Sequence, residues 1–219
     1  MSEASNGRWP GTELDALVHI GVAKKYRRGA VLFREGEDAS TVVVVRSGRV
    51  KISSLTSDGK EIVLAVREPG EVLGELSAVD GEPRSATATA LESVEISVID
   101  AEDFRGFLRA RPGLALRLVQ IVSSRLRDAD RKRVEFGAYD TVGRVARRLV
   151  ELAERFGEPS YGAVRITLPL SQQELAGWTG ASREAVSKAL QQLRSRGLIE
   201  TARRGITVCD IDGLRERAI

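Results

Sequence analysis

The sequence predicts an α+β fold in three consecutive parts: a β-roll of the jelly-roll (double-stranded β-helix) type, one long helix, and a small domain with a helix-turn-helix and a two-stranded wing. Between residues 26 and 99, short Val, Ile and Leu runs alternate with glycines, which is typical of many short strands joined by turns. From residue 112 to about 136, apolar residues recur at helical spacing. Residues 171–188 carry the cap and turn signals of two short helices. The predicted parts are residues 1–110, 111–137 and 138–219.

In the first part, the clearest strand patterns are residues 41–45, 49–52 and 61–66, where β-branched residues predominate or alternate with polar ones. A short helix is predicted before them, within residues 12–22, and another after them at 101–109. Strands of this length, separated by glycine turns, favour a sandwich or roll over a parallel α/β sheet.

The long helix is predicted to begin at Pro112. Proline suits the first turn of a helix, because the backbone N–H that it lacks would have no hydrogen-bond partner within the helix there. A lone long helix beside a small β domain must bury its apolar stripe, and the same helix of a second copy is the simplest partner. A homodimer is therefore predicted, the alternative being a helix that packs only on its own β domain. The predicted stripe consists of Leu114, Leu118, Ile121, Val122, Leu126 and Ala129.

The pattern breaks at residues 136–139, and we predict a hinge there, near Gly137. Asp140 is expected to cap the next helix, residues 141–155, by accepting a backbone N–H of its first turn. A turn-rich loop is predicted at 157–162. The two strands of the wing are predicted at residues 198–201 and 206–209.

Composition excludes several classes of protein. Cys209 is the only cysteine and His19 the only histidine, which leaves no material for an internal disulfide, an iron–sulfur cluster or a His-rich metal site. Haem and other metal cofactors are therefore not expected, nor is enzymatic activity. No apolar run approaches the roughly 20 residues that span a bilayer, and no secretory signal is visible at the N-terminus. A cytoplasmic protein without a membrane partner is expected.

The two short helices predicted within residues 171–188 have the signals of a DNA-reading motif. Ser171 and Glu174 have the spacing of a capping box, Gly180 suits a left-handed turn, and Ser182 can cap the second helix. Residues 183–204 contain six basic residues and two acidic ones, a charge excess suited to a phosphate backbone. Double-stranded DNA is the predicted partner, and a charged helical hairpin without ligand is the alternative. The predicted DNA-binding residues are Ser171, Gln172, Ser182, Arg183, Glu184, Ser187, Lys188 and Arg203.

A second motif, Gly74 to Ala86, has the chemistry to bind a ribose phosphate. The Arg84 guanidinium can donate two hydrogen bonds to phosphate oxygens, and Ser85 can add a hydroxyl. Glu75 can accept the proton of a ribose hydroxyl. The alternative is that Glu75 and Arg84 form only an ion pair at a turn. The predicted ligand-binding residues of this region are Leu64, Gly74, Glu75, Leu76, Ser77, Arg84, Ser85 and Ala86.

With both motifs in order around a long helix, the chain resembles the cyclic AMP receptor protein/FNR family of bacterial transcription regulators. Gly74-Glu75 and Arg84-Ser85-Ala86 resemble the family's phosphate-binding cassette, and residues 182–188 resemble its recognition helix. The resemblance implies a cyclic-nucleotide-binding β-roll, a dimerising helix and a winged helix-turn-helix. It also implies a homodimer on a palindromic TGTGA-like operator, with RNA polymerase as a further partner. Lys188 stands where receptor-type members carry an arginine, which leaves the innermost base open.

The long helix departs from the family where it would meet the base of the nucleotide. Ala129 and Asp130 occupy the positions of a Thr-Ser pair. Asp130 could accept hydrogen bonds from adenine or from guanine, so the residues leave the base open. We expect an allosteric effector, cyclic AMP in preference to cyclic GMP, that acts by shifting a conformational population. The alternatives are a ligand-independent DNA-binding regulator with a vestigial cassette, a response to a cyclic dinucleotide, and a metal-binding roll enzyme.

Overall fold

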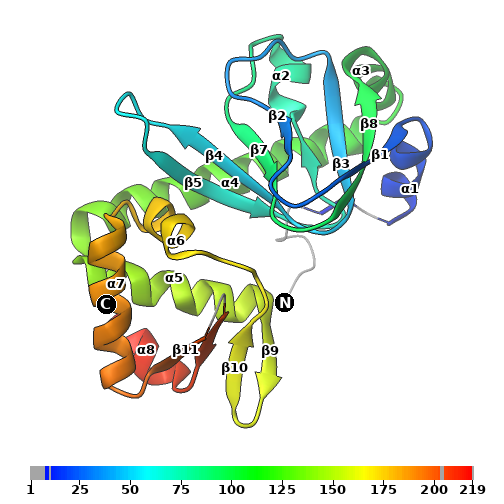
Figure 1. Ribbon diagram of the computed structural model, residues 1–219. Helices are drawn as coiled ribbons and strands as arrows, with labels where there is room; N and C mark the ends of the chain where they lie inside the picture. The colour runs from blue at the N-terminus through cyan, green and yellow to red at the C-terminus, as the bar shows by residue number, and fades with distance from the viewer. Residues whose placement is uncertain (1–7, 10, 203–204, 219) are drawn as a thin grey trace. The chain divides into compact units, whose positions relative to one another are not determined.

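The computed structural model describes residues 8–9, 11–202 and 205–218 (Figure 1). The chain forms two compact units, the first built mainly from residues up to 129 and the second mainly from residue 130 onward. Helix α4 (Pro112–Ala138) contributes to both units. In the described part of the chain, no helix is both long and apolar enough to cross a membrane.

The first unit contains two antiparallel four-stranded sheets, in the orders β1-β8-β3-β6 and β2-β7-β4-β5. The strands predicted at 41–45, 49–52 and 61–66 are confirmed as β3, β4 and β5, with ends shifted by at most three residues. Together the two sheets make the predicted β-roll. Its strands are β1 (Val22–Tyr26), β2 (Val31–Phe33), β3 (Thr41–Ser47), β4 (Val50–Leu55), β5 (Glu61–Arg67), β6 (Val72–Leu73), β7 (Thr87–Ala90) and β8 (Val94–Asp100).

The run of four valines in β3 explains how the roll is filled. Successive side chains of a strand point to opposite faces, so a strand with all four buried must be covered on both sides. Val43 and Val45 belong to the core cluster between the two sheets. Val42 and Val44 belong to a second cluster, on the face of the sheet that the helices cover. The helices of this unit are α1 (Gly11–His19), α2 (Glu75–Asp80), α3 (Ala101–Arg109) and the first part of α4.

Helix α4 has two apolar faces, and this corrects the predicted stripe. Leu114, Leu118 and Ile121 are buried in the core of their own β-roll together with residues of α3, so they do not form a free seam. Leu126 of the predicted stripe is exposed, and so are Leu116 and Val119 of α4, which the predicted stripe did not include. The sequence alone did not separate the two faces of α4, because apolar residues three or four positions apart occur on both of them.

The break predicted at residues 136–139 is present but shorter, and the hinge itself stays a prediction. Gly137 is helical, α4 continues to Ala138, and the break consists of Tyr139 and Asp140 alone. The last turns of α4 are tied to the second unit: Arg147 of α5 donates to the Glu135 carboxylate at 2.7 Å. The buried Arg148 also pairs with Glu135, and burial lowers the pKa of this guanidinium to about 10, so it stays charged at neutral pH.

In its described residues, the second unit combines four helices with a four-stranded antiparallel sheet of order β11-β12-β10-β9. The predicted loop at 157–162 is wrong: residues 157–160 form strand β9, paired with β10, and only Tyr161 and Gly162 turn, both with positive φ. Gly, Glu and Pro are poor strand formers, so pairing with β10 overrides local preference here. The wing is confirmed, shifted by one residue. The elements are α5 (Thr141–Phe156), β9 (Gly157–Ser160), β10 (Ala163–Ile166), α6 (Gln172–Thr179), α7 (Arg183–Ser195), β11 (Ile199–Ala202), β12 (Gly205–Val208) and α8 (Ile211–Arg217).

Asp140 caps α5 as predicted, and its replacement should destabilise the protein. Its carboxylate accepts from the Gly143 amide at 2.6 Å and from Arg217 of α8 at 2.7 Å. We expect Asp140→Ala to lower the free energy of unfolding by about 1 kcal/mol through the lost cap. Asp140→Asn, which retains a capping oxygen, should lose less. Urea unfolding followed by circular dichroism measures both.

The effect of Asp140 should depend on pH. Arg217 chiefly, then the Gly143 amide, holds the pKa of Asp140 below its ordinary value. A carboxyl whose folded pKa is depressed contributes stability above its unfolded pKa and loses it as pH falls through the folded pKa. The difference between wild type and Asp140→Ala should therefore shrink below about pH 4. A difference that stays constant down to about pH 2 would contradict this account.

Candidate nucleotide-binding and DNA-binding sites

The phosphate-binding motif is built on the turn from β6 into α2. Gly74 lies at this turn with φ of 74°, in the left-handed region that favours glycine. A Cβ on Gly74 would lie 2.0 Å from Nη1 of Arg84, so a side chain there would displace the guanidinium. Both the backbone conformation and the close approach of Arg84 therefore require glycine at this position.

Arg84 is buried, with 5% of its surface exposed. Nη2 donates to the carbonyl and the hydroxyl of Thr41, at 2.7 and 3.1 Å, and Nη1 donates to the Gly74 carbonyl at 3.2 Å. The guanidinium also lies over the Phe33 ring, 4.4 Å from its centroid. Neutral groups thus hold the side chain in place. In the described chain, nothing accepts from its Nε and no carboxylate lies within ion-pair distance.

The electrostatics of Arg84 favour an anion. Burial lowers the pKa of its guanidinium, and the nearby Glu75 and Glu37 carboxylates only partly oppose this effect. A buried charge without a close counter-ion is costly, and an anion bound beside it removes part of that cost. The arrangement is therefore that of a receptor for one negative charge, rather than of the simple Glu75–Arg84 ion pair considered above.

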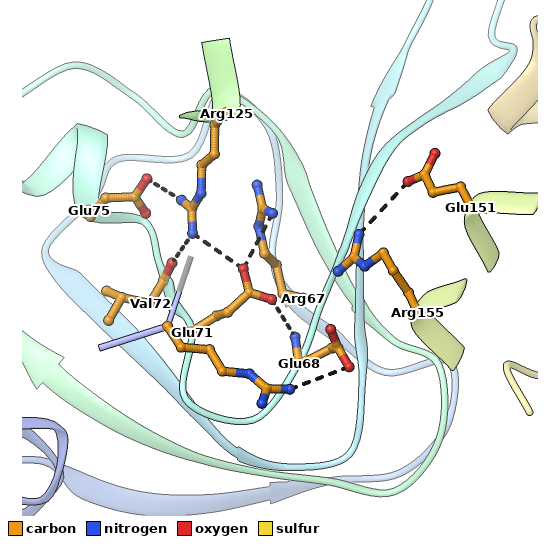
Figure 2. Close-up of polar contacts among 9 residues, drawn as sticks. Arg67, Glu68, Glu71, Val72, Glu75, Arg125, Glu151 and Arg155 are labelled. Atoms are coloured by element: carbon orange, nitrogen blue, oxygen red, sulfur yellow. Dashed lines mark hydrogen bonds and ion pairs between the residues drawn. The ribbon is translucent and has the colours of Figure 1, made fainter. Parts of the chain in front are cut away.

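Glu75 is paired instead with Arg125, which reaches it from α4 (Figure 2). Nη1 of Arg125 donates to Oε1 of Glu75 at 2.6 Å, and Nη2 donates to the Val72 carbonyl at 3.0 Å. Glu75 is only 4% exposed, yet none of the described residues donates to its second oxygen, Oε2. That oxygen can accept from a ligand hydroxyl while Oε1 stays bound to Arg125.

The other predicted ligand residues take different positions. Ser77 is buried and its hydroxyl donates to the Pro83 carbonyl, so it holds the motif together. Ser85 is exposed beside the buried Ala86, and Leu64 of β5 and Leu76 of α2 are exposed apolar side chains. Ala129 and Asp130 are exposed on α4, where Asp130 pairs with Arg133 at 3.5 Å. Their part in binding the base stays a prediction.

Sequence reasoning missed two residues that shape this site, Thr41 and Arg125. Arg125 had a signal: it follows the buried Ile121 by four residues, so it lies on the same face of α4 as the core leucines. A charged residue on a buried face indicates a buried partner. Thr41 gave no such signal, because a threonine at the start of a strand is common.

The DNA-reading motif has the predicted caps. The Ser171 hydroxyl accepts from the Glu174 amide while the Glu174 carboxylate accepts from the Ser171 amide, which completes the capping box of α6. Ser182 caps α7 by accepting from the Ala185 amide at 3.1 Å. Gly180 ends α6 with φ of 60°. The two helices are thus set by local hydrogen bonds that the sequence encodes directly.

Helix α7 separates a buried face from an exposed one. Its buried residues are Val186, Ala189, Leu190 and Leu193, while Arg183, Glu184, Ser187 and Lys188 are exposed at its N-terminal end. Hydrogen bonds from its own backbone amide and from Ser182 lower the pKa of Glu184, which keeps it an ionised acceptor at neutral pH. Gln172 is exposed at the start of α6. Arg203, predicted to contact DNA from the wing, lies outside the described residues.

The turn between α6 and α7 is held by contacts with the end of α4 and with α5. A Cβ on Gly180 would lie 2.4 Å from the Phe136 ring, so this glycine permits close contact with the end of α4. Arg144 of α5 donates to the Thr179 and Tyr139 carbonyls at 2.9 and 2.7 Å. These contacts fix the orientation in which α7 presents its exposed face. The exposed N-terminal end of α7 is the part that a recognition helix places in the major groove of DNA.

Two family models match the two halves of this arrangement. Residues 23–111 match the cyclic nucleotide-binding domain, and residues 143–217 match the Crp-like helix-turn-helix domain. The CRP-like cAMP-activated global transcriptional regulator of Mycobacterium tuberculosis is 36% identical over 98% of this chain and 97% of its own length. The chain belongs to the Crp/Fnr family of transcription regulators. It is thus a ligand-responsive, DNA-binding regulator.

Other members show how far this family varies in ligand. The cyclic AMP receptor protein of Thermus thermophilus is 30% identical over 85% of this chain and 83% of its own length. The solved structure of the c-di-GMP responsive global regulator CLP from Xanthomonas campestris is 25% identical, with a TM-score of 0.80, and covers 91% of this chain and 99% of its own. Family membership therefore leaves the choice among cyclic nucleotides to the site itself.

Proposed function

We propose that this chain is a homodimeric, sequence-specific transcription regulator whose affinity for DNA is set by a cyclic mononucleotide, cyclic AMP in preference to cyclic GMP. The observation that carries the proposal is the pair formed by Arg84 and Glu75. Arg84 is a buried cation without a carboxylate partner among the described residues, and Glu75 Oε2 is a carboxylate oxygen without a donor there. A cyclic ribose phosphate offers one anion and one hydroxyl to match them.

The charges of the site favour a mononucleotide. Arg125 is paired with the Glu75 carboxylate, so among the described residues of the motif Arg84 is the cation left for an incoming anion. A cyclic mononucleotide carries one phosphodiester charge and compensates this cation. A cyclic dinucleotide carries two, and its second charge would need a further cation. The preference for cyclic AMP over cyclic GMP rests on relatives named as cAMP-dependent, because Asp130 could accept from either base.

The exposed stripe of α4 supports the homodimer. Leu116, Val119 and Leu126 recur at spacings of three and seven residues, which is the pattern of a two-helix seam. Arg183 and Glu184 suit guanine and cytosine on adjacent base pairs, which agrees with a palindromic TGTGA-like operator. The proposal includes a cytoplasmic protein without enzymatic activity that acts together with RNA polymerase.

The proposed mechanism is a population shift that starts at α4. Arg125 is a residue of α4 and binds the carboxylate that receives the ribose, so a ligand at Glu75 acts on this helix directly. The nucleotide favours one arrangement of the chain, and that arrangement binds the operator. Coupling of this kind is reciprocal, so operator DNA must tighten nucleotide binding by the same factor.

Calorimetric titration of the purified protein with cyclic AMP, cyclic GMP and cyclic di-GMP tests the proposal. We expect cyclic AMP to bind with about micromolar affinity, near −8 kcal/mol, and the other two more weakly. A repeat with a duplex carrying two TGTGA half-sites one helical turn apart should tighten cyclic AMP binding. No binding of any nucleotide to a folded protein would favour the ligand-independent alternative. Tighter binding of cyclic di-GMP would overturn the charge argument.

A further inference from the structure

We propose that Glu71 is a positioning residue for nucleotide binding: it orients Arg125 so that Glu75 keeps one carboxylate oxygen for the ribose hydroxyl. This inference rests on the proposed function, because it specifies how the same site recognises ribose. Glu71 lies just before β6, and its hydrogen bonds and ion pairs go to residues other than the predicted ligand residues. Its influence passes through the arginine that joins it to Glu75 (Figure 2).

Glu71 is a fully engaged, buried carboxylate, 2% exposed. Its Oε2 accepts from the Glu68 amide at 2.8 Å. Its Oε1 lies 3.4 Å from Nη1 of Arg67 and 3.8 Å from Nη2 of Arg125. The backbone of Glu71 is fixed as well, since its carbonyl accepts from the Val45 amide. A buried carboxylate held by this many interactions keeps one position, and it therefore restricts the positions of the arginine side chains that pair with it.

Arg125 is held at three points, two of which involve Nη2. The Val72 carbonyl and the Glu71 carboxylate both face Nη2, at 3.0 and 3.8 Å, while Nη1 faces Glu75 at 2.6 Å. With Nη2 occupied in this way, the guanidinium presents a single nitrogen to Glu75. It therefore binds one oxygen of Glu75 and leaves the other free.

Loss of the Glu71 charge should weaken this restraint, because the Val72 carbonyl alone then faces Nη2. Arg125 faces two carboxylates, Glu71 and Glu75, and neutralising Glu71 leaves Glu75 as the carboxylate that attracts Arg125. An arginine attracted by only one carboxylate prefers to bind both its oxygens with two parallel hydrogen bonds. Oε2 would then be taken by Arg125, and the ribose hydroxyl would lose its acceptor.

The test compares cyclic AMP with 2′-deoxy-cyclic AMP, which lacks the hydroxyl that Glu75 receives. For Glu71→Gln we expect cyclic AMP to bind about tenfold more weakly, with binding of the deoxy analogue nearly unchanged. The ratio of the affinity for cyclic AMP to the affinity for 2′-deoxy-cyclic AMP should fall by the same factor. In the Glu75→Gln background, adding Glu71→Gln should cost little more, because both act on one hydrogen bond. Glu92→Gln, which neutralises one member of another partly buried ion pair, with Arg49, is the matched control and should change neither affinity.

The possible outcomes separate this inference from the proposed function. Equal losses for both nucleotides would show that Glu71 only maintains the fold, and would overturn the inference while the proposed function stands. A wild-type protein that binds neither nucleotide would overturn both. If Glu71→Gln does not fold, Glu71→Asp carries the test, because the shorter carboxylate moves away from Arg125. It should lower the ribose preference about twofold to threefold, and an unchanged preference would overturn the inference.

Discussion

Arg84→Ala is expected to abolish nucleotide-dependent DNA binding while leaving the protein folded. The guanidinium is the only buried cation that the described cassette leaves without a carboxylate partner, so its loss removes the counter-charge of the phosphate. Charge-assisted hydrogen bonds contribute about 1.5–3 kcal/mol each. Loss of two of them should weaken nucleotide binding by at least about 100-fold, measured by calorimetry. Operator binding should then no longer respond to added cyclic AMP in a fluorescence anisotropy assay.

Two further variants make this result specific. Arg84→Lys keeps the positive charge but loses the two guanidinium nitrogens that donate to Thr41 and Gly74 at the same time. We therefore expect it to bind the nucleotide with an affinity between those of wild type and Arg84→Ala. Arg49→Ala removes an arginine of the same unit that pairs with Glu92, and it should leave nucleotide binding unchanged. If Arg84→Ala binds DNA as wild type does, with or without nucleotide, the cassette is vestigial and the ligand-independent alternative is correct.

Arg183→Ala is expected to remove most of the preference for the operator. Arg183 is exposed at the N-terminal end of α7, where a recognition helix meets base edges, and a bidentate contact to guanine gives about 1–3 kcal/mol of discrimination. Binding to the intact operator should fall about 10- to 100-fold. Binding to a duplex with the guanine replaced should hardly change. Competition binding with single-base variants of each half-site measures this loss directly.

Arg194 offers a matched control on the same helix. It is exposed in the last turn of α7, away from the N-terminal end that carries Arg183. Arg194→Ala should weaken binding to all duplexes by a similar small factor and preserve the order of preference among them. A uniform loss in Arg183→Ala as well would mean that this residue contacts phosphate, and the predicted reading of guanine would be wrong.

The sequence was most informative where a structure depends on nearby residues. The caps at Asp140, Ser171 and Ser182 follow from hydrogen bonds to amides three residues away, and all three are present. The strands and helices with strong periodicity were predicted to within a few residues. The strand at 157–160 was missed because its stability comes from pairing with β10 rather than from its own residues.

The candidate site divides in the same way. Gly74, Glu75 and Arg84 could be named because they lie close together in the sequence as a motif. Arg125 meets Glu75 across 50 residues, and Thr41 meets Arg84 across 43, so only the folded chain shows these partners. The sequence predicted that Glu75 receives the ribose, but not that an arginine already holds one of its oxygens.

The two faces of α4 impose a condition on its length. Each residue turns an α-helix by about 100°, so Leu118 and Ile121 on the buried face fix the angular phase of every later side chain. Inserting one residue after Ile121 would swing Arg125 about a quarter-turn away from Glu75 and move Leu126 out of line with Val119. Inserting seven residues would return these side chains to within about 20° of their original direction around the helix axis, although they would then lie one heptad further along that axis. Between Ile121 and Leu126 the helix should therefore tolerate many substitutions on its outer face but no single-residue insertion or deletion.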